Sequence, residues 1–348
     1  MNRSRILFLL LPLACSAQTI QGNVQNGTTG KPQREQQVVL FTASGEQGHA
    51  VTNDNGDFQL EPHTALSPHS PATLAVTHEG VVYFQAVRVA QRANVRVYEA
   101  SQSASGISGY LSILQFQVKG RLLQVTELHA FSNASNPPIT RVDPNNLVLS
   151  LPEGAHVGPA TVSGPDGGTT KVLLVSIPGR TAQYRIDFPI KPGLTKYAIS
   201  YDIPYGGNLA FRRQAQYPMR RIGVIVPETM RLDSLGAKLF HEIKDQSGTH
   251  ELVLDNLPAH EMLAFDLSGA GELAHAFRPA IPGQPARPTG TNRLMSPPWP
   301  LRGSLGTSGE PTEVRTGFVG HYLTLAMGMF VLAGIVLRRM MLRRNGRI

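Results

Sequence analysis

The sequence predicts an all-β protein built from tandem β-sandwich domains, with an N-terminal signal peptide and one C-terminal transmembrane helix. Between the two ends, short runs rich in Val, Ile, Leu, Tyr and Thr are separated by Gly, Pro, Asn and Asp at roughly eight- to twelve-residue intervals, a spacing typical of small sandwiches. Helical periodicity is scarce. The length of 348 residues leaves room for about two folded units plus attachments.

Residues 1–17, MNRSRILFLLLPLACSA, predict a cleaved signal peptide. Two arginines precede an apolar run and small residues follow it, which is the order of a secretory signal. We expect cleavage after Ala17. A lipoprotein with Cys15 at its new N-terminus is the alternative, but Pro12 and Leu13 depart from the lipid-attachment pattern.

A first sandwich of seven strands is expected in residues 18–100. The run of strands and turns in this range has the strand number of a small sandwich. The expected strands are Thr19–Val24, Gln36–Thr42, His49–Thr52, Asp57–Leu60, Ala72–His78, Val81–Val87 and Ala93–Glu99.

The stretch VTNDNGDFQL, Val51–Leu60, raises the choice between a calcium loop and a tight turn. Oxygen-bearing side chains alternate in it, but a helix-loop-helix calcium site needs twelve residues closed by a bidentate Glu and flanked by helices. Strands flank this stretch instead. Asn55-Gly56 is a strong hairpin signal, because both residues tolerate the positive φ of a type I′ turn. We therefore predict a hairpin turn.

Four motifs of this first region occur in a recognisable order. They are Ile20-x-Gly22-x-Val24, Thr29-Gly30-Lys31-Pro32, Val38–Leu40 and Thr52-Asn53-x-x-Gly56-x-Phe58-x-Leu60. Together they resemble the carboxypeptidase regulatory-like domain, a transthyretin-like sandwich grouped with carbohydrate-binding-like folds. The resemblance implies a sandwich over residues 18–100 and no peptidase activity. Two departures are the insert Pro62–Pro71 and Glu79-Gly80-Val81, where an aromatic residue often follows the glycine.

A second β-rich region is expected over residues 110–277, after the Ser- and Gly-rich spacer Ser101–Gly109. The segment Leu114–Asn133 alternates apolar and polar residues like a half-buried strand pair that bends at Lys119-Gly120. We expect one or two further sandwich units. Leu232–Asp245 is compatible with a short helix or with a strand ending in a turn. This part of the chain resembles uncharacterised bacterial envelope proteins.

No catalytic, cofactor-binding or metal-ligating residue is assigned from the sequence, and we expect a protein that is not an enzyme. A zinc hydrolase needs a second His four residues after a His-Glu pair on a helix. Val82, Asp245, Leu254 and Ala264 occupy those positions. Gly106–Tyr110 also fails the G-x-S-x-G pattern at its last position. The pairs themselves are His78-Glu79, His241-Glu242, His250-Glu251 and His260-Glu261.

Residues 278–316 predict a Pro-rich linker that does not fold. They contain eight prolines in 39 residues, and Pro279, Pro282, Pro285 and Pro288 follow the three-residue repeat of a polyproline II helix. A stiff spacer is the favoured interpretation. The alternative is a ligand for a partner domain around Trp299.

Residues 317–337 predict a transmembrane helix. The segment GFVGHYLTLAMGMFVLAGIVL has no formal charge and as a helix would rise about 31 Å, close to the roughly 30 Å thickness of a bilayer's hydrocarbon. Five arginines follow in the tail, residues 338–348, and the positive-inside rule makes that tail cytoplasmic. We therefore expect a single-pass protein of the plasma (inner) membrane, in contact with lipid through its helix, with a periplasmic or extracellular ectodomain.

Charge and cysteine content narrow the class of protein. The net charge of +8 falls to +1 for residues 18–337 when two arginines of the signal and five of the tail are removed. No basic excess is left outside the membrane to bind nucleic acid. The single cysteine lies in the signal, so the mature chain has neither a disulfide nor a thiolate metal site, which favours a bacterial envelope protein.

These observations predict a membrane-anchored, non-enzymatic cell-envelope protein that presents sandwich modules for ligand or partner binding, as a scaffold or adhesion protein. Its partner would be another envelope protein or a glycan. A carbohydrate-binding module is the alternative, and only Tyr83, Phe84, Tyr98 and the insert would supply its aromatic platform. The other alternative is a hydrolase whose site is not visible in the sequence.

Overall fold

The computed structural model describes residues 18–67, 71–88, 91–103, 105–235, 240–243 and 248–273. These residues contain 24 strands and no helix, so the all-β prediction is confirmed for them. The predicted signal peptide (1–17), Pro-rich linker (278–316), transmembrane helix (317–337) and tail (338–348) lie outside the described residues. No helix in the described part of the chain is long and apolar enough to cross a membrane.

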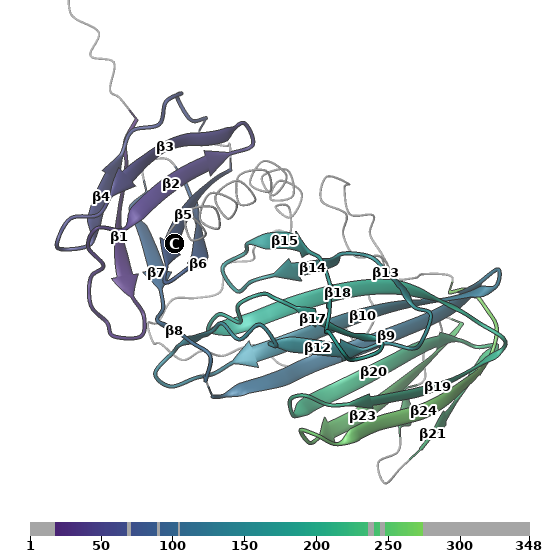
Figure 1. The fold of residues 1–348 in the computed structure, drawn as a ribbon. Helices are drawn as coiled ribbons and strands as arrows, with labels where there is room; N and C mark the ends of the chain where they lie inside the picture. Colours follow the sequence, from purple (N-terminus) through teal and green to yellow (C-terminus); the bar gives the residue numbers. More distant parts are fainter. Residues whose placement is uncertain are drawn as a thin grey trace, which may run out of the picture.

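The first region is a two-sheet unit around its own hydrophobic core (Figure 1). One sheet has the order β4-β1-β7 and the other β3-β2-β5-β6. All seven expected runs form strands, with ends shifted by a few residues. The strands are β1 (Ile20–Asn26), β2 (Gln37–Thr42), β3 (Gly45–Val51), β4 (Asp57–Leu60), β5 (Ala72–His78), β6 (Val81–Val87) and β7 (Ala93–Val97).

The Asn55-Gly56 turn does not close a hairpin, so that prediction is wrong in its pairing. β3 pairs with β2 whereas β4 pairs with β1, so the chain changes sheets at this turn. Gly56 has φ 75°, but Asn55 is not among the residues with positive φ, as a type I′ turn would require. The Asn53 side chain shapes the turn by accepting hydrogen bonds from the N–H groups of Asn55 and Asp57.

The second region is dominated by a nine-stranded sheet (Figure 1). Its main path runs β15-β14-β18-β10-β9-β20-β23-β22, and β13 pairs with β18. Its strands are β9 (Ile107–Lys119), β10 (Leu122–Asn133), β13 (His156–Val157), β14 (Ala160–Ser163), β15 (Thr169–Val172), β18 (Gly193–Pro204), β20 (Met219–Pro227), β22 (His241–Ile243) and β23 (Thr249–Leu257).

Two three-stranded sheets, β12-β17-β16 and β19-β24-β21, complete this region. Inward side chains from these sheets and from the nine-stranded sheet form one contiguous hydrophobic core, which includes Phe116, Leu149, Tyr197, Phe211 and Phe265. The strands are β12 (Leu147–Ser150), β16 (Val175–Ser176), β17 (Gln183–Ile186), β19 (Asn208–Gln214), β21 (Met230–Ser234) and β24 (Met262–Gly269).

Local predictions within this region can be compared with the strands. The expected strand pair in Leu114–Asn133 is the antiparallel hairpin β9–β10, which turns at Gly120 with φ 64°. In Leu232–Asp245, the described residues include the end of β21 and all of β22, so strand rather than helix is found where the chain is described.

A buried ion pair joins the two regions at the outer edge of β6. Lys191, in the turn before β18, donates from Nζ to the Val82 carbonyl at 2.6 Å and pairs with the Asp166 carboxylate. Asp166 in turn accepts a hydrogen bond from the Phe84 N–H at 3.0 Å. The ammonium also lies 5.1 Å from the centre of the Tyr83 ring. Thus the second region supplies hydrogen-bond partners to an edge strand of the first.

A short parallel pair, β8 (Ala100–Ser101) with β11 (Thr140–Arg141), forms a second link between the regions. The hydroxyl of Tyr83 lies beside it, 2.8 Å from Thr140 Oγ1 and 3.0 Å from the Tyr98 carbonyl oxygen to which it donates. Burial raises the pKa of Tyr83 to about 12, so the hydroxyl keeps its proton at neutral pH.

We predict that Lys191→Met destabilises the protein by about 3 kcal/mol or more, because it leaves the Asp166 carboxylate buried without its cation. Adding Asp166→Asn should recover part of that loss, since the uncompensated charge is then gone. Urea unfolding of the three proteins measures this. Arg231→Met removes an exposed ion pair with Asp233 and should cost less than about 1 kcal/mol. A Lys191→Met protein as stable as this control would contradict the prediction.

Candidate functional site

The candidate site lies on β10, where polar residues occupy core-facing positions. In this strand every second residue from Leu123 to Asn133 is buried, and Glu127 and His129 fall in that register. Because side chains of a strand alternate between its two faces, both point into the apolar core of the second region. Such groups need partners, since an unpaired buried charge is strongly destabilising.

Ser112, His129 and Glu127 form a hydrogen-bonded chain in this core. Ser112 on β9 lies directly opposite His129 in the β9–β10 ladder, and its Oγ is 2.8 Å from His129 Nδ1. His129 Nε2 is 2.8 Å from Glu127 Oε2. A neutral imidazole with its proton on Nε2 satisfies both contacts by donating to the carboxylate and accepting from the hydroxyl.

Arg213 reaches Glu127 from the opposite layer of the sandwich. Its side chain projects from β19 and binds the carboxylate in bidentate fashion, with Nη1–Oε2 at 2.5 Å and Nη2–Oε1 at 2.8 Å. Tyr201 on β18 donates its hydroxyl to Glu127 Oε1 at 2.6 Å. The Glu127 carboxylate therefore has four hydrogen bonds to three side chains, those of His129, Tyr201 and Arg213. Its ion pair with Arg213 connects the small β19-β24-β21 sheet to the large sheet.

The ion pair keeps Glu127 charged although the side chain is fully buried. Burial alone raises the pKa of a carboxyl, but the charge of Arg213 and the hydrogen bonds from His129 and Arg213 outweigh it, so the pKa of Glu127 lies well below its usual range. Burial, together with the glutamate's charge, raises the pKa of Tyr201 well above its ordinary value. The carboxylate is thus an acceptor at neutral pH and the phenol a donor.

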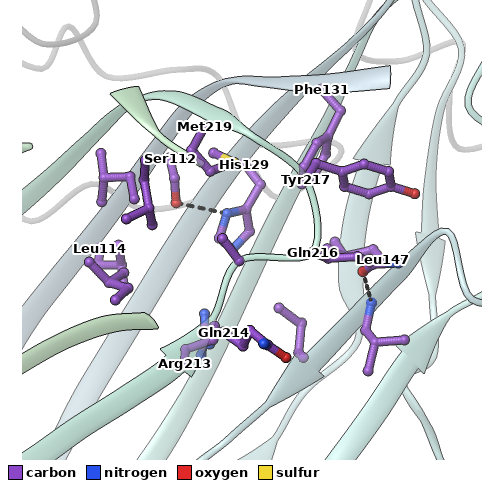
Figure 2. A pocket seen from close by; sticks show the side chains of 16 residues that line it. Ser112, Leu114, His129, Phe131, Leu147, Arg213, Gln214, Gln216, Tyr217 and Met219 are labelled. Carbon is purple, nitrogen blue, oxygen red and sulfur yellow. Dashed lines mark hydrogen bonds between the residues drawn. The ribbon is translucent and has the colours of Figure 1, made fainter. Parts of the chain in front are cut away.

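A small cavity opens beside this chain (Figure 2). It encloses about 60 Å³ and is lined mainly by apolar side chains, among them Leu147 and Phe131. Polar side chains in its lining are those of Ser112, His129, Arg213, Gln214, Gln216 and Tyr217. Pockets for drug-sized ligands occupy roughly 300–1,000 Å³. The cavity therefore has room for a few water molecules or one small side chain.

The order Ser–His–Glu is that of a nucleophile, a general base and its orienting acid. Acyl transfer also needs free hydrogen-bond donors for the oxyanion. Ser112 lies within β9, which is paired on both sides, with β10 and with β20, so the backbone around it is used by the sheet. Arg213 is already committed to Glu127. Ser112, His129 and Glu127 thus form a complete hydrogen-bonded chain, whereas the described residues show no free oxyanion donor in the β9 backbone or in Arg213.

The four His-Glu pairs of the sequence do not assemble into a single site, although two of them are in contact. His78 ends β5 and Glu79 lies in the turn after it, whereas His241-Glu242 lies within β22 and His250-Glu251 within β23. His260-Glu261 lies in the turn before β24. Neighbouring residues of a strand point to opposite faces, so a pair within a strand does not form one site. The contact found between pairs is that of His250 Nδ1 with Glu242 Oε1 at 2.6 Å, across the β22–β23 ladder.

Sequence reasoning missed the residues of the candidate site. A signal for two of them was present, because Glu127 and His129 interrupt an alternating apolar pattern on the buried face of β10. No local signal marks Arg213, which is 86 residues from Glu127. Gly106–Tyr110, which failed the nucleophile pattern, ends at β9 residues near the strand's start and contributes nothing to the cavity.

No protein-family model and no curated protein matches this sequence. Solved structures that resemble it include the M1 zinc metallopeptidase from Deinococcus radiodurans, with 13% identity over 47% of this chain and 42% of that chain and a TM-score of 0.29. A variant of a two-domain M1 zinc metallopeptidase bound to L-tryptophan has 13% identity, 48% and 44% coverage and the same TM-score. The chain thus spans less than half the length of these structures, and similarity at this level supports no conclusion about activity.

We predict that Glu127→Gln destabilises the protein by about 3–5 kcal/mol at neutral pH, because Arg213 is left without its buried counter-charge. The substitution should also reduce the loss of unfolding free energy that occurs as the pH is lowered. The folded-state pKa of Glu127 lies below the unfolded value of about 4.3, so its contribution is complete above that value and is lost as the pH falls toward the folded pKa.

Urea unfolding between pH 7 and pH 3 measures both effects. The wild type should lose stability on acidification more steeply than Glu127→Gln. Asp233→Asn, at an exposed carboxylate, is the matched control and should keep the wild-type slope. Equal slopes for the wild type and Glu127→Gln would contradict the assignment.

Proposed function

We propose that this chain is a membrane-anchored, non-enzymatic cell-envelope protein that presents two joined β-sandwich modules to a partner protein, as a scaffold. The observation that carries the proposal is the buried Lys191–Asp166 pair at the edge of β6, together with the β8–β11 ladder. Modules that act independently are usually joined by exposed linkers with few contacts across them. A joint built on buried charge instead favours one relative orientation, because alternative orientations would leave those charges unpaired.

The membrane anchor rests on the sequence. Residues 317–337 are uncharged and long enough to span a bilayer, and the arginines of the tail favour a cytoplasmic C-terminus. With the predicted signal peptide 1–17, these features support a location of the modules in the periplasm or outside the cell, joined to the anchor by the predicted Pro-rich spacer 278–316. The resemblance of residues 18–100 to a carboxypeptidase regulatory-like domain agrees with a role in binding rather than catalysis.

A glycan is the less favoured ligand, because the candidate aromatics take part in the junction. Tyr83 is buried and hydrogen-bonded to Thr140, and the rings of Tyr83 and Phe84 both lie beside the Lys191 ammonium. Phe84 also packs closely on Gly168. A flat sugar-binding platform needs exposed rings, so these residues favour a protein partner instead.

The scaffold proposal predicts that partner binding is lost when an added side chain at Gly168 separates the second region from Phe84 of the first. A Cβ at position 168 would lie 2.3 Å from the Phe84 ring, whereas one at Gly158 would meet its nearest atom at 3.8 Å. We expect Gly168→Ala to reduce partner recovery several-fold after crosslinking in native membranes, and Gly158→Ala to leave it unchanged. Crosslinked neighbours are identified by mass spectrometry from membranes washed in alkaline carbonate.

Two outcomes would overturn the proposal. The full-length chain washing off the membranes would remove the anchor. Equal recovery of the same neighbours with Gly168→Ala, with equal circular dichroism and unfolding midpoints, would show that the relative orientation of the modules is irrelevant.

A hydrolase is the second candidate function, favoured by the Ser112–His129–Glu127 chain beside a cavity. Under the scaffold proposal we expect no labelling of Ser112 by a fluorophosphonate probe, because Ser112 is buried and the β9 backbone and Arg213 offer no free oxyanion donor in the described part of the chain. Ser112→Ala is the matched control, since it removes the nucleophile and little volume. Labelling of the wild type that is absent from Ser112→Ala would establish a reactive serine and refute the non-enzymatic proposal.

A further inference from the structure

A second polar cluster lies beside the junction, and none of the functions above uses it. His78 is the last residue of β5, Glu79 follows it in the β5–β6 turn, and Glu99 lies between β7 and β8. One side-chain nitrogen or oxygen from each residue lies within 4.8 Å of the other two. An imidazole and two carboxylates from three separate backbone positions therefore converge on one point.

His78 has a buried ring nitrogen that lacks a hydrogen bond. Its Nε2 is shielded from solvent and has no hydrogen-bond partner among the described residues. The Oε1 of Glu99 is 3.6 Å away, beyond normal hydrogen-bond range. The imidazole side chain is only 11% exposed. A buried polar atom without a hydrogen-bond partner costs folding free energy, and a bound metal ion would satisfy this nitrogen.

The two carboxylates are held in place by other groups. Glu99 Oε1 accepts a hydrogen bond from the Asn26 side-chain amide, and Glu79 Oε2 accepts one from the Ala100 N–H at 2.5 Å. Adjacent carboxylates repel unless a proton or a cation lies between them. No Lys or Arg forms an ion pair with either one among the described residues.

We propose that His78, Glu79 and Glu99 bind a divalent transition-metal ion, with Zn²⁺ as the preferred occupant. One imidazole nitrogen and two carboxylate oxygens are a donor set that zinc accepts, with water completing its coordination. Calcium and magnesium prefer oxygen donors alone, so the imidazole selects against them. Ligand atoms of a tetrahedral zinc site lie about 3.3 Å apart, given bonds of about 2.0–2.1 Å. Small side-chain rotations are enough to close the cluster from its present spacing.

The ion would strengthen the junction between the regions. It would connect the β5–β6 turn to Glu99, whose carbonyl accepts a hydrogen bond from the Thr140 N–H at 2.9 Å in the second region. The N–H of Glu99 donates to Thr28 Oγ1, and that hydroxyl donates to the Pro138 carbonyl. Metal binding would therefore hold Glu99 in place, and the backbone of Glu99 makes hydrogen bonds at the junction of the two regions. This inference does not depend on the scaffold proposal, because it concerns metal affinity alone.

Calorimetric titration of the untagged, metal-free full-length chain in detergent with zinc chloride tests the site. We expect one Zn²⁺ per chain and a higher melting temperature when the ion is bound. His78→Ala, Glu79→Gln and Glu99→Gln should each weaken binding at least about tenfold, because even loss of a group that only supports a ligand costs about 10–100-fold. Glu79→Gln and Glu99→Gln retain a carbonyl oxygen for the Ala100 and Asn26 hydrogen bonds, so folding is expected to survive.

His250→Ala is the matched control, because His250 contacts one glutamate but belongs to no cluster of three metal ligands among the described residues. It should bind zinc with wild-type affinity, and magnesium should produce no heat in any of the proteins. Visible absorption of bound Co²⁺ gives a second measurement, with bands expected for the wild type and absent from Glu79→Gln and Glu99→Gln. Wild-type affinity and spectra in those two variants, or equal losses in His78→Ala and His250→Ala, would overturn the proposal.

Discussion

The outer edge of β6 imposes the constraint on which the relation between the two regions depends. β6 is the last strand of its sheet, so its outward N–H and C=O groups need partners from elsewhere. Lys191 and Asp166 supply them, one binding the Val82 carbonyl and the other the Phe84 N–H. An ion pair from the second region thus replaces the next strand, and it blocks the edge against other chains. Burial lowers the pKa of Lys191 although Asp166 acts in the opposite direction, which shows how far this ammonium is removed from water.

The same physical principle operates inside the second region. Glu127 and Arg213 come from opposite layers of the sandwich and neutralise each other in an otherwise apolar core. A buried ion pair of this kind adds little net stability compared with a pair of apolar side chains. A shift in the packing of the two sheets, however, would leave each charge buried without its partner. The pair therefore specifies how the layers stack. His129 and Ser112 extend the network to the cavity wall, where they satisfy each other without exposing a free nucleophile.

The three polar clusters differ in whether the chain itself provides the balancing charge. Asp166 has Lys191, and Glu127 has Arg213. Glu79 and Glu99 have no Lys or Arg as an ion-pair partner among the described residues, and the His78 ring lies beside them. In the first two clusters the chain itself supplies the balancing cation, whereas in the third the proposed zinc ion would supply it. The proposed zinc site therefore lies beside the contacts that join the two regions.

The strands were predictable because the signal for a strand is local. Alternation of side chains between two faces is visible in any run of six or seven residues, and it located the seven strands of the first region and the β9–β10 hairpin. The turn at Asn55-Gly56 was also predictable as a turn. Its strand partners were not, because turn residues determine local backbone angles, whereas the pairing of β4 with β1 and of β3 with β2 depends on distant segments.

The sites depend on tertiary structure for the same reason. The alternating pattern of β10 indicates that Glu127 is a buried charge, but Arg213, which neutralises it, is 86 residues away in the sequence. Lys191 and the Val82 carbonyl, which it binds, are 109 residues apart in the sequence. The alternation of apolar and polar residues gives no information about contacts over such separations. The sequence by itself therefore determined the all-β class and most strand positions. The polar residues Glu127 and His129 on the buried face of β10 were visible in it, but their role was not predicted. Only the packing of sheets decided which charges meet, because complementary groups have no influence on each other until the backbone brings them within hydrogen-bond distance.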